Sequence, residues 1–145
     1  MHRNLDKPIA EYIKKVNIYQ VLIVILLILT SLTRLIGLGD RVMSHDEVNH
    51  VVPSFDLFTG RGYRHDPVTH GPLQFHLMAL SYFLFGDNDF TSRLPHAIFS
   101  IATVWFVMVF FRRYLGKYGA IAAGLLFAIS PFMLFYGRYA RNDAL

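Results

Sequence analysis

The sequence contains no cysteine among its 145 residues. Disulfide bonds, thiolate metal sites and cysteine nucleophiles are therefore excluded. Charge is also scarce: charged residues make up 17% of the chain, and a formal net charge of +4 argues against a nucleic-acid-binding surface. We find no internal repeat and no secretory cleavage site, and the residues before the first apolar segment are too charged for a signal peptide. That segment is expected to stay as a membrane anchor.

Apolar surface is what the chain has in quantity. Hydrophobic residues make up 54% of the chain, aromatic residues make up 15%, and the mean hydropathy is +0.38. A soluble domain of this length does not need so much apolar surface, because part of it must face water, whereas lipid-facing helices do need it. The sequence therefore predicts an all-α membrane protein with about three transmembrane helices.

Three segments have the length and composition of bilayer-spanning helices. They are residues 18–38, 94–111 and 118–136. Arg34 lies near the far end of the first segment, where its long side chain is expected to reach the lipid headgroups. Pro131 is expected to bend the last turns of the third.

A fourth apolar segment, residues 72–85, is ambiguous. It is only about 14 residues long and contains Gln74 and His76, which suits an interfacial or re-entrant helix better than a span. With three spans, the basic residues of the N-terminus lie on the same side as Arg112 and Arg113, and the positive-inside rule makes that side the cytoplasm.

Three spans fix the expected placement of every other segment. Residues 1–17 are expected as a cytoplasmic N-terminal segment, and residues 112–117 as a cytoplasmic loop. The loop 39–93, with interfacial helices at about 45–59 and 72–85, and the segment 137–145 are expected on the outer side. Any chemistry that these two outer segments share would then be extracytoplasmic.

The predicted outer loop opens with two adjacent carboxylates, Asp46 and Glu47. Like charges repel, and a nearby bilayer penalises ionisation, so such a pair costs free energy. A functional role that would offset this cost is to bind a divalent cation or to supply a base. A plainer alternative explains the same residues equally well. Ser44 fits a helix N-cap, with Glu47 at the third position of a capping box.

Five of the seven histidines fall in this loop region, at positions 45, 50, 65, 70 and 76. Turn residues frame His70 just before the short apolar helix. Asp46, Glu47 and His65 could supply oxygen and nitrogen ligands to a divalent cation. Histidines also favour membrane interfaces because they are amphipathic, so a metal site is one of two interpretations.

Two arginines follow the third predicted span, on the side that the positive-inside rule disfavours. Arg138 and Arg141 are three residues apart, so on a helical continuation they would share a face. Two guanidinium groups on one face suit a phosphate or pyrophosphate. The alternatives are contact with lipid phosphates or pairing with Asp143.

The order of the motifs resembles that of a known superfamily. The motifs are Asp46-Glu47, His70-Gly71-Pro72-Leu73, the segment from Phe85 to Leu94 before the second span, and the segment from Tyr136 to Asp143 after the third. This set resembles the GT-C glycosyltransferases, polytopic enzymes that use lipid-phosphate-linked sugars. The chain is most similar to the protein mannosyltransferase and aminoarabinose transferase branch, and within it to the prokaryotic flippase-activity-associated proteins. The resemblance covers the chain from about residue 18 to its end.

The resemblance implies roles for individual residues. Asp46 matches the first-loop acid that deprotonates or orients the acceptor, Glu47 matches its partner, and Asp143 matches a second acid beyond the third span. His70 occupies the place of the histidine in the family's His-Pro-Pro-Leu motif, although Gly71 here replaces the first proline.

The resemblance also implies the reaction and its partners. A sugar would pass from a polyprenyl-phosphate donor to a glycan, lipid or protein acceptor, with inversion. Arg138 and Arg141, with or without a divalent cation, would stabilise the departing lipid phosphate. The expected location is the plasma (inner) membrane, with the active site on its outer face.

Members of this superfamily have many more spans, so we expect the chain to be the N-terminal part of a longer enzyme and inactive by itself. A second hypothesis is a small three-span scaffold or assembly subunit without chemistry. A third is a metal transporter that uses the loop histidines, but the predicted spans lack ionisable residues along a path.

Overall fold

The computed structural model describes residues 17–64 and 71–141, which form six helices and contain no strand. The prediction of an all-α membrane protein is confirmed. The helices are α2 (Ile18–Leu35), α3 (His45–Thr59), α4 (Leu73–Phe85), α5 (Asp89–Phe110), α6 (Arg112–Ile129) and α7 (Pro131–Tyr136).

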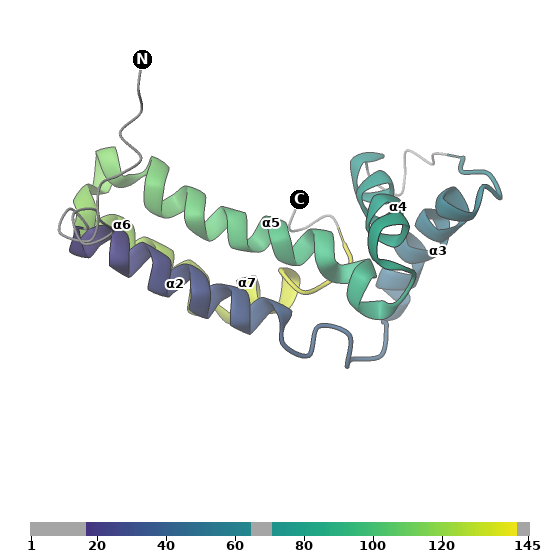
Figure 1. Ribbon diagram of the computed structural model, residues 1–145, viewed down its shortest axis with the longest axis horizontal. Coiled ribbons are helices and arrows are strands. Elements are labelled where there is room, and N and C mark those ends of the chain that lie inside the picture. The colour runs from purple at the N-terminus through teal and green to yellow at the C-terminus, as the bar shows by residue number, and fades with distance from the viewer. Residues whose placement is uncertain (1–16, 65–70, 142–145) are drawn as a thin grey trace, which may run out of the picture.

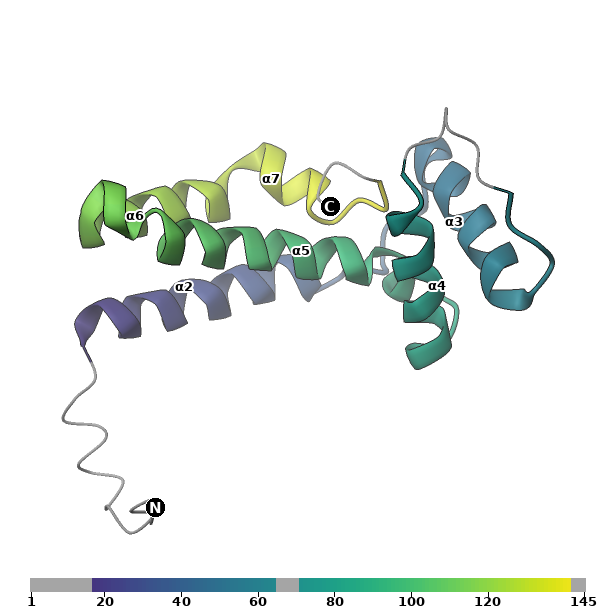
Figure 2. The ribbon, with the colours of Figure 1, turned by 90° about the horizontal axis from the view of Figure 1, so that it is seen from above.

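The helices form a long bundle with a cross-piece at one end. Helices α2, α5 and α6 run side by side along the long axis, whereas α3 and α4 pack against each other across the end where α5 begins (Figures 1 and 2). Helix α7 leads the chain back to the same end. The segments after α2, before α5 and after α7 therefore meet there, although they are far apart in the sequence.

Two of these helices are long and apolar enough to cross a membrane. Helix α2 has a mean hydropathy of 2.1 over 18 residues, and the 22-residue helix α5 has a most apolar stretch of mean hydropathy 1.5. Each begins at an asparagine, Asn17 or Asn88, whose side chain accepts a hydrogen bond from the first turn. The predicted spans in these places, residues 18–38 and 94–111, differ from the observed helices by up to five residues at their ends.

The third predicted span, residues 118–136, is not a single helix. Helix α6 begins at Arg112, passes a kink at Gly116, whose φ is +69°, and ends at Ile129. Ser130 is extended and Pro131 is the first residue of α7, because a residue before proline is pushed out of the helical region. The segment 112–117, expected as a loop, is therefore mostly helical, and a crossing by α6 and α7 together stays a prediction.

Close packing of apolar side chains holds the helices of the bundle together. Leu26 of α2, Val104 and Met108 of α5 and Ala128 of α6 form a buried apolar cluster. A Cβ atom at Gly124 of α6 would overlap the Met108 side chain, so glycine is required for this approach of α6 to α5. Small residues that allow such approaches are typical of helix packing in membranes.

Arg34 corrects one expectation from the sequence. Its side chain does not reach outward to headgroups but is fully buried between the helices. Its guanidinium donates hydrogen bonds to the carbonyl oxygens of Ala128 (2.7 Å) and Phe127 (3.3 Å), at the end of α6. Carbonyls in the last turn of a helix lack partners within that helix, and the buried guanidinium donates the hydrogen bonds that they require.

The arrangement generates a topology prediction that cysteine labelling can check, since the chain has no native cysteine. Asn49 lies on α3 at the cross-piece end, and Tyr118, which is 81% exposed, lies near the α5–α6 turn at the opposite end. In Asn49→Cys the thiol should react with a membrane-impermeant maleimide in intact cells. In Tyr118→Cys it should react only after permeabilisation, and equal labelling of both in intact cells would contradict a bundle that crosses the bilayer.

Candidate functional site

The predicted acidic pair lies at the start of α3, and its two members face different surroundings. Ser44 is the N-cap: its hydroxyl accepts a hydrogen bond from the Glu47 amide, and the Glu47 carboxylate accepts one from the Ser44 amide. The capping box that the sequence allowed is therefore present. It does not account for the whole pair, because Glu47 is completely buried while the Asp46 side chain is 55% exposed.

Glu47 makes a forked ion pair with Arg93 at the start of α5. Arg93 Nε lies 2.8 Å from Glu47 Oε1, and Arg93 Nη2 lies 3.1 Å from Oε2. Both side chains are at most 1% exposed. A two-point contact between a planar guanidinium and a carboxylate fixes the relative orientation of the two helices as well as their distance.

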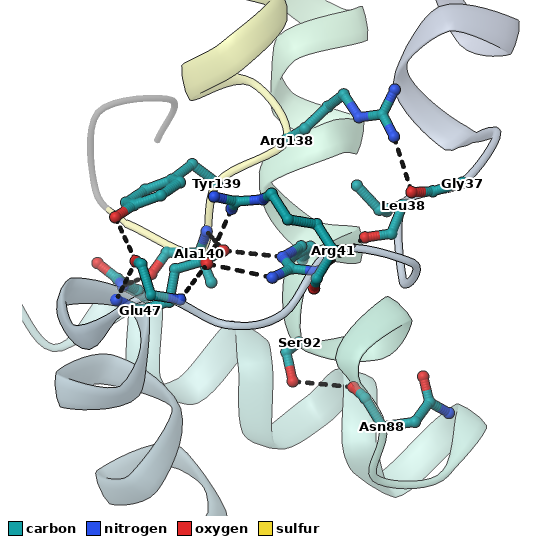
Figure 3. Close-up of polar contacts among 12 residues, drawn as sticks. Gly37, Leu38, Arg41, Glu47, Asn88, Ser92, Arg138, Tyr139 and Ala140 are labelled. Atoms are coloured by element: carbon teal, nitrogen blue, oxygen red, sulfur yellow. Dashed lines mark hydrogen bonds and ion pairs between the residues drawn. The ribbon is translucent and has the colours of Figure 1, made fainter.

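Two further segments reach the same carboxylate. Arg41, in the loop after α2, donates from Nη2 to Glu47 Oε2 at 2.8 Å, and the backbone amide of Ala140 donates to Oε1 at 3.1 Å (Figure 3). Glu47 therefore joins α3 to the segments after α2 and after α7 as well as to α5. Each of its oxygens accepts hydrogen bonds from protein groups.

The electrostatics of Glu47 follow from these partners. Burial alone would raise the pKa of its carboxyl group, because removal from water disfavours the charged form. The hydrogen bonds from Arg93 and from the amides of Ala140 and Ser44, with the charge of Arg93, outweigh that cost and hold the pKa below its ordinary value. Glu47 is thus a stable anion at neutral pH, and its geometry is that of a positioning residue.

Arg93 also fixes the loop that follows α2. Its Nη1 atom donates to the carbonyl oxygens of Leu38 and Arg41, each at 2.9 Å. Since the opposite edge of the same guanidinium holds Glu47, one side chain sets the position of α3 relative to the end of α2. No sequence pattern assigned an individual role to Arg93 or Arg41. The available signal was an arginine at the start of a membrane span, which requires a buried anion or carbonyls as partners.

Asp46 lies beside one of the arginines that the sequence proposed as phosphate ligands. Arg141 Nη1 is 3.3 Å from Asp46 Oδ2, and these side chains are 35% and 55% exposed. The acid of the first loop and a cation from beyond α7, separated by 95 positions, thus meet at the same end of the bundle. An accessible carboxylate beside a guanidinium can accept a proton while the cation binds an anion.

The second predicted phosphate ligand, Arg138, has a different environment. Its guanidinium donates to the carbonyl oxygens of Thr33 (2.8 Å), Ile36 (2.8 Å) and Gly37 (2.9 Å), where α2 ends. Figure 3 shows Arg138 directed toward Gly37 and away from Glu47. Arg138 and Arg141 therefore do not share a face, because the chain after α7 turns instead of continuing as a helix.

Three predicted site residues, His65, His70 and Asp143, lie outside the described residues. Within residues 17–64 and 71–141, no group of three or more histidine, aspartate or glutamate side chains is arranged to hold a metal ion. The interpretation of Asp46, Glu47 and His65 as a cation site stays a prediction.

Aromatic residues lie beside Arg41 and the start of α3. The Arg41 guanidinium carbon lies 5.0 Å from the ring centroid of Tyr139 and 5.5 Å from that of Phe135. The Tyr139 hydroxyl shares a hydrogen bond with the Ser44 hydroxyl. The segment after α7 thus packs directly over the start of α3, which brings Arg141 to Asp46.

Part of the chain matches a known protein family. A family model described as dolichyl-phosphate-mannose-protein mannosyltransferase matches residues 69–145, which is more than half of the chain. No curated protein and no solved structure matches the chain significantly.

The buried pair leads to a prediction about stability and pH. Because the pKa of Glu47 is lower in the folded state than in the unfolded chain, its contribution to stability is present above about pH 4.5 and is lost as the pH falls through the folded-state pKa. Glu47→Gln should lower the free energy of unfolding by about 3 kcal/mol at pH 7, since it leaves Arg93 without a buried counter-ion.

The measurement is the thermal unfolding midpoint of the purified protein in detergent at several pH values. The gap between wild type and Glu47→Gln should narrow as the pH falls below about 4. Asp56→Asn, a partly exposed acid near the other end of α3, is the matched control and should leave the midpoint nearly unchanged. A gap that is constant with pH would show that Glu47 is not an anion in the folded protein.

Proposed function

The chain belongs to the dolichyl-phosphate-mannose-protein mannosyltransferase family. From this premise we propose a reaction for the residues at the end of the bundle where α3 and α4 lie. The protein is a membrane glycosyltransferase of the GT-C type. We propose that it transfers a sugar from a polyprenyl-phosphate-linked donor to a hydroxyl acceptor at the extracytoplasmic face of the plasma (inner) membrane. The observation that carries this proposal is the accessible Asp46 carboxylate beside Arg141, next to an end of the bundle.

Asp46 is the proposed catalytic base. The acceptor hydroxyl gives its proton to the Asp46 carboxylate while its oxygen forms a bond to the anomeric carbon of the sugar. The bond between that carbon and the phosphate oxygen breaks, and its electron pair leaves with the lipid phosphate. Attack from the side opposite the leaving group inverts the anomeric configuration.

Arg141 is the proposed partner of the leaving phosphate. Its guanidinium lies beside the base, so one exposed cation can stabilise negative charge as it develops on the leaving group. Asp143, the second acid that the resemblance implies, and His70, which we propose as a further phosphate contact, lie outside the described residues. Glu47 acts through others: it fixes the start of α3 and thereby the position of Asp46.

The location at the bundle end suits a lipid-linked donor. A polyprenyl chain is soluble only in hydrocarbon, whereas its phosphate and sugar require water and cations. A site at the point where α2 ends and α5 begins satisfies both requirements. The acceptor, whether glycan, lipid or protein, would approach from the aqueous side, where Asp46 is exposed.

Substitution of Asp46 tests the proposal. In membranes from cells that produce the complete protein, Asp46→Asn should lower sugar transfer from a polyprenyl-phosphate donor at least 100-fold, because loss of a general base costs about 10²–10⁴ in rate. The measured quantity is the incorporation of radiolabelled sugar. Asp56→Asn, on the same helix but away from Arg141, is the control and should retain activity. Wild-type transfer by Asp46→Asn would contradict the assignment of Asp46 as the base, whereas the absence of any transfer by the unsubstituted protein would favour a non-enzymatic scaffold.

A divalent cation is a second means of neutralising the phosphate, with Asp46, Glu47 and His65 as proposed ligands. Both Glu47 oxygens already accept hydrogen bonds from Arg93, Arg41 or backbone amides, so a cation would rely mainly on Asp46 and His65. We expect transfer to persist after treatment with EDTA, because the arginines supply the positive charge. Loss of transfer on chelation, with recovery on adding Mn²⁺ or Mg²⁺, would assign that role to a metal.

A further inference from the structure

A groove with cationic and apolar walls lies between the end of α2 and α7. It has a volume of about 480 Å³. Arg41 and Arg138 supply its charge, and Leu38, Pro131, Leu134 and Phe135 supply its apolar surface. Such a combination is suited to an amphiphilic anion, whose charged end requires cations and whose chain requires hydrocarbon.

Arg41 is the cation in this groove whose guanidinium is held in place and still accessible to a ligand. One of its N–H groups donates to Glu47, its backbone carbonyl accepts from Arg93, and its guanidinium lies over the rings of Tyr139 and Phe135. These contacts limit the freedom of the side chain, which nevertheless stays 45% exposed. A guanidinium has five N–H groups, and among the described residues Arg41 uses one of them, so it can still donate to an anion.

Arg138 contributes positive charge to the groove, because most of its hydrogen-bond donors are already engaged with the protein. Three of its donor contacts go to carbonyl oxygens at the end of α2. Its guanidinium therefore serves as a fixed positive charge on the wall opposite α7. The sequence paired Arg138 with Arg141 as phosphate ligands, whereas the groove pairs it with Arg41.

A second, apolar cavity lies next to Pro131. This cavity, of about 640 Å³, lies at the break between α6 and α7 and shares Pro131 with the first. Its walls include Leu126, Ile129 and Phe132, which are 65%, 57% and 63% exposed. Together the two cavities offer positive charge beside the end of α2 and exposed apolar side chains at the break between α6 and α7.

We propose that Arg41 binds the phosphate of the lipid-linked donor, and that the polyprenyl chain of that donor lies over the break between α6 and α7. This inference rests on the proposed function, because it names where the donor of that reaction is held. It assigns a binding residue that the sequence motifs did not indicate. Arg141 then acts on the same phosphate from the side of Asp46.

The test is direct binding of a polyprenyl monophosphate that carries no sugar, measured with the complete purified protein in detergent. Arg41→Gln should raise the dissociation constant about 10- to 100-fold, the loss expected for one charge-assisted hydrogen bond. Arg61→Gln, an exposed arginine that stacks on Phe55 near the other end of α3, is the matched control and should bind as wild type does. Unchanged binding by Arg41→Gln would overturn the proposal.

Three further variants separate binding from folding and test the lipid chain, and a competition experiment separates a lipid from free phosphate. Arg41→Lys keeps the charge and should recover part of the affinity, which a merely misfolded variant would not do. Phe132→Ser should weaken binding of the long-chain lipid, while Phe83→Ser, a 76% exposed residue of α4, should not. Inorganic phosphate in millimolar excess should not displace the lipid, and displacement would assign the groove to free phosphate instead.

The binding assay also separates this inference from the proposed function. If Asp46→Asn abolishes transfer and Arg41→Gln binds the lipid normally, the reaction stands and the assignment of Arg41 falls. If the wild-type protein transfers no sugar but binds the lipid through Arg41, the binding site stands and the proposed reaction falls.

Discussion

The carboxylate of Glu47 and the guanidinium of Arg93 lie 2.8 Å apart at a point from which water is excluded. Burial of either charge alone would cost several kcal/mol, and the cost is offset only when both groups have a full set of partners. Here Arg93 also holds two carbonyls of the loop after α2, and Glu47 also holds Arg41 and the amide of Ala140. Four segments are tied together at the end of the bundle, and the geometry of the site follows from that connection.

One consequence is a division of roles between two adjacent acids. Successive side chains on an α-helix point about 100° apart, so when Glu47 faces the interior, Asp46 must face the side of the helix. Asp46 therefore stays accessible at the position where Arg141 arrives. A pair that is costly when both acids share one environment becomes acceptable because only one of them is buried, and that one has cations beside it.

The arginines of the bundle follow a related logic. Arg34 and Arg138 bind carbonyl oxygens at the ends of α6 and α2, where backbone acceptors would otherwise lack partners in an apolar environment. Arg41 and Arg141 keep part of their side chains exposed. The position of an arginine at the edge of a span therefore does not reveal whether it serves the helix ends or a ligand; its hydrogen-bond partners do.

Local sequence determined most of the helices. The apolar runs around 18–35 and 94–110, the Ser44 cap and the Ser130–Pro131 break act within a few residues, so the pattern alone predicts helices, a cap and a bend near Pro131. The motifs around Asp46 and after Tyr136 likewise indicated the superfamily. Only the tertiary structure decided which arginine meets which acid. Glu47 and Arg93 are 46 positions apart, and their contact depends on how α3 and α4 pack across the start of α5 and which face each helix presents. That arrangement depends on the packing of whole helices, which no local pattern encodes.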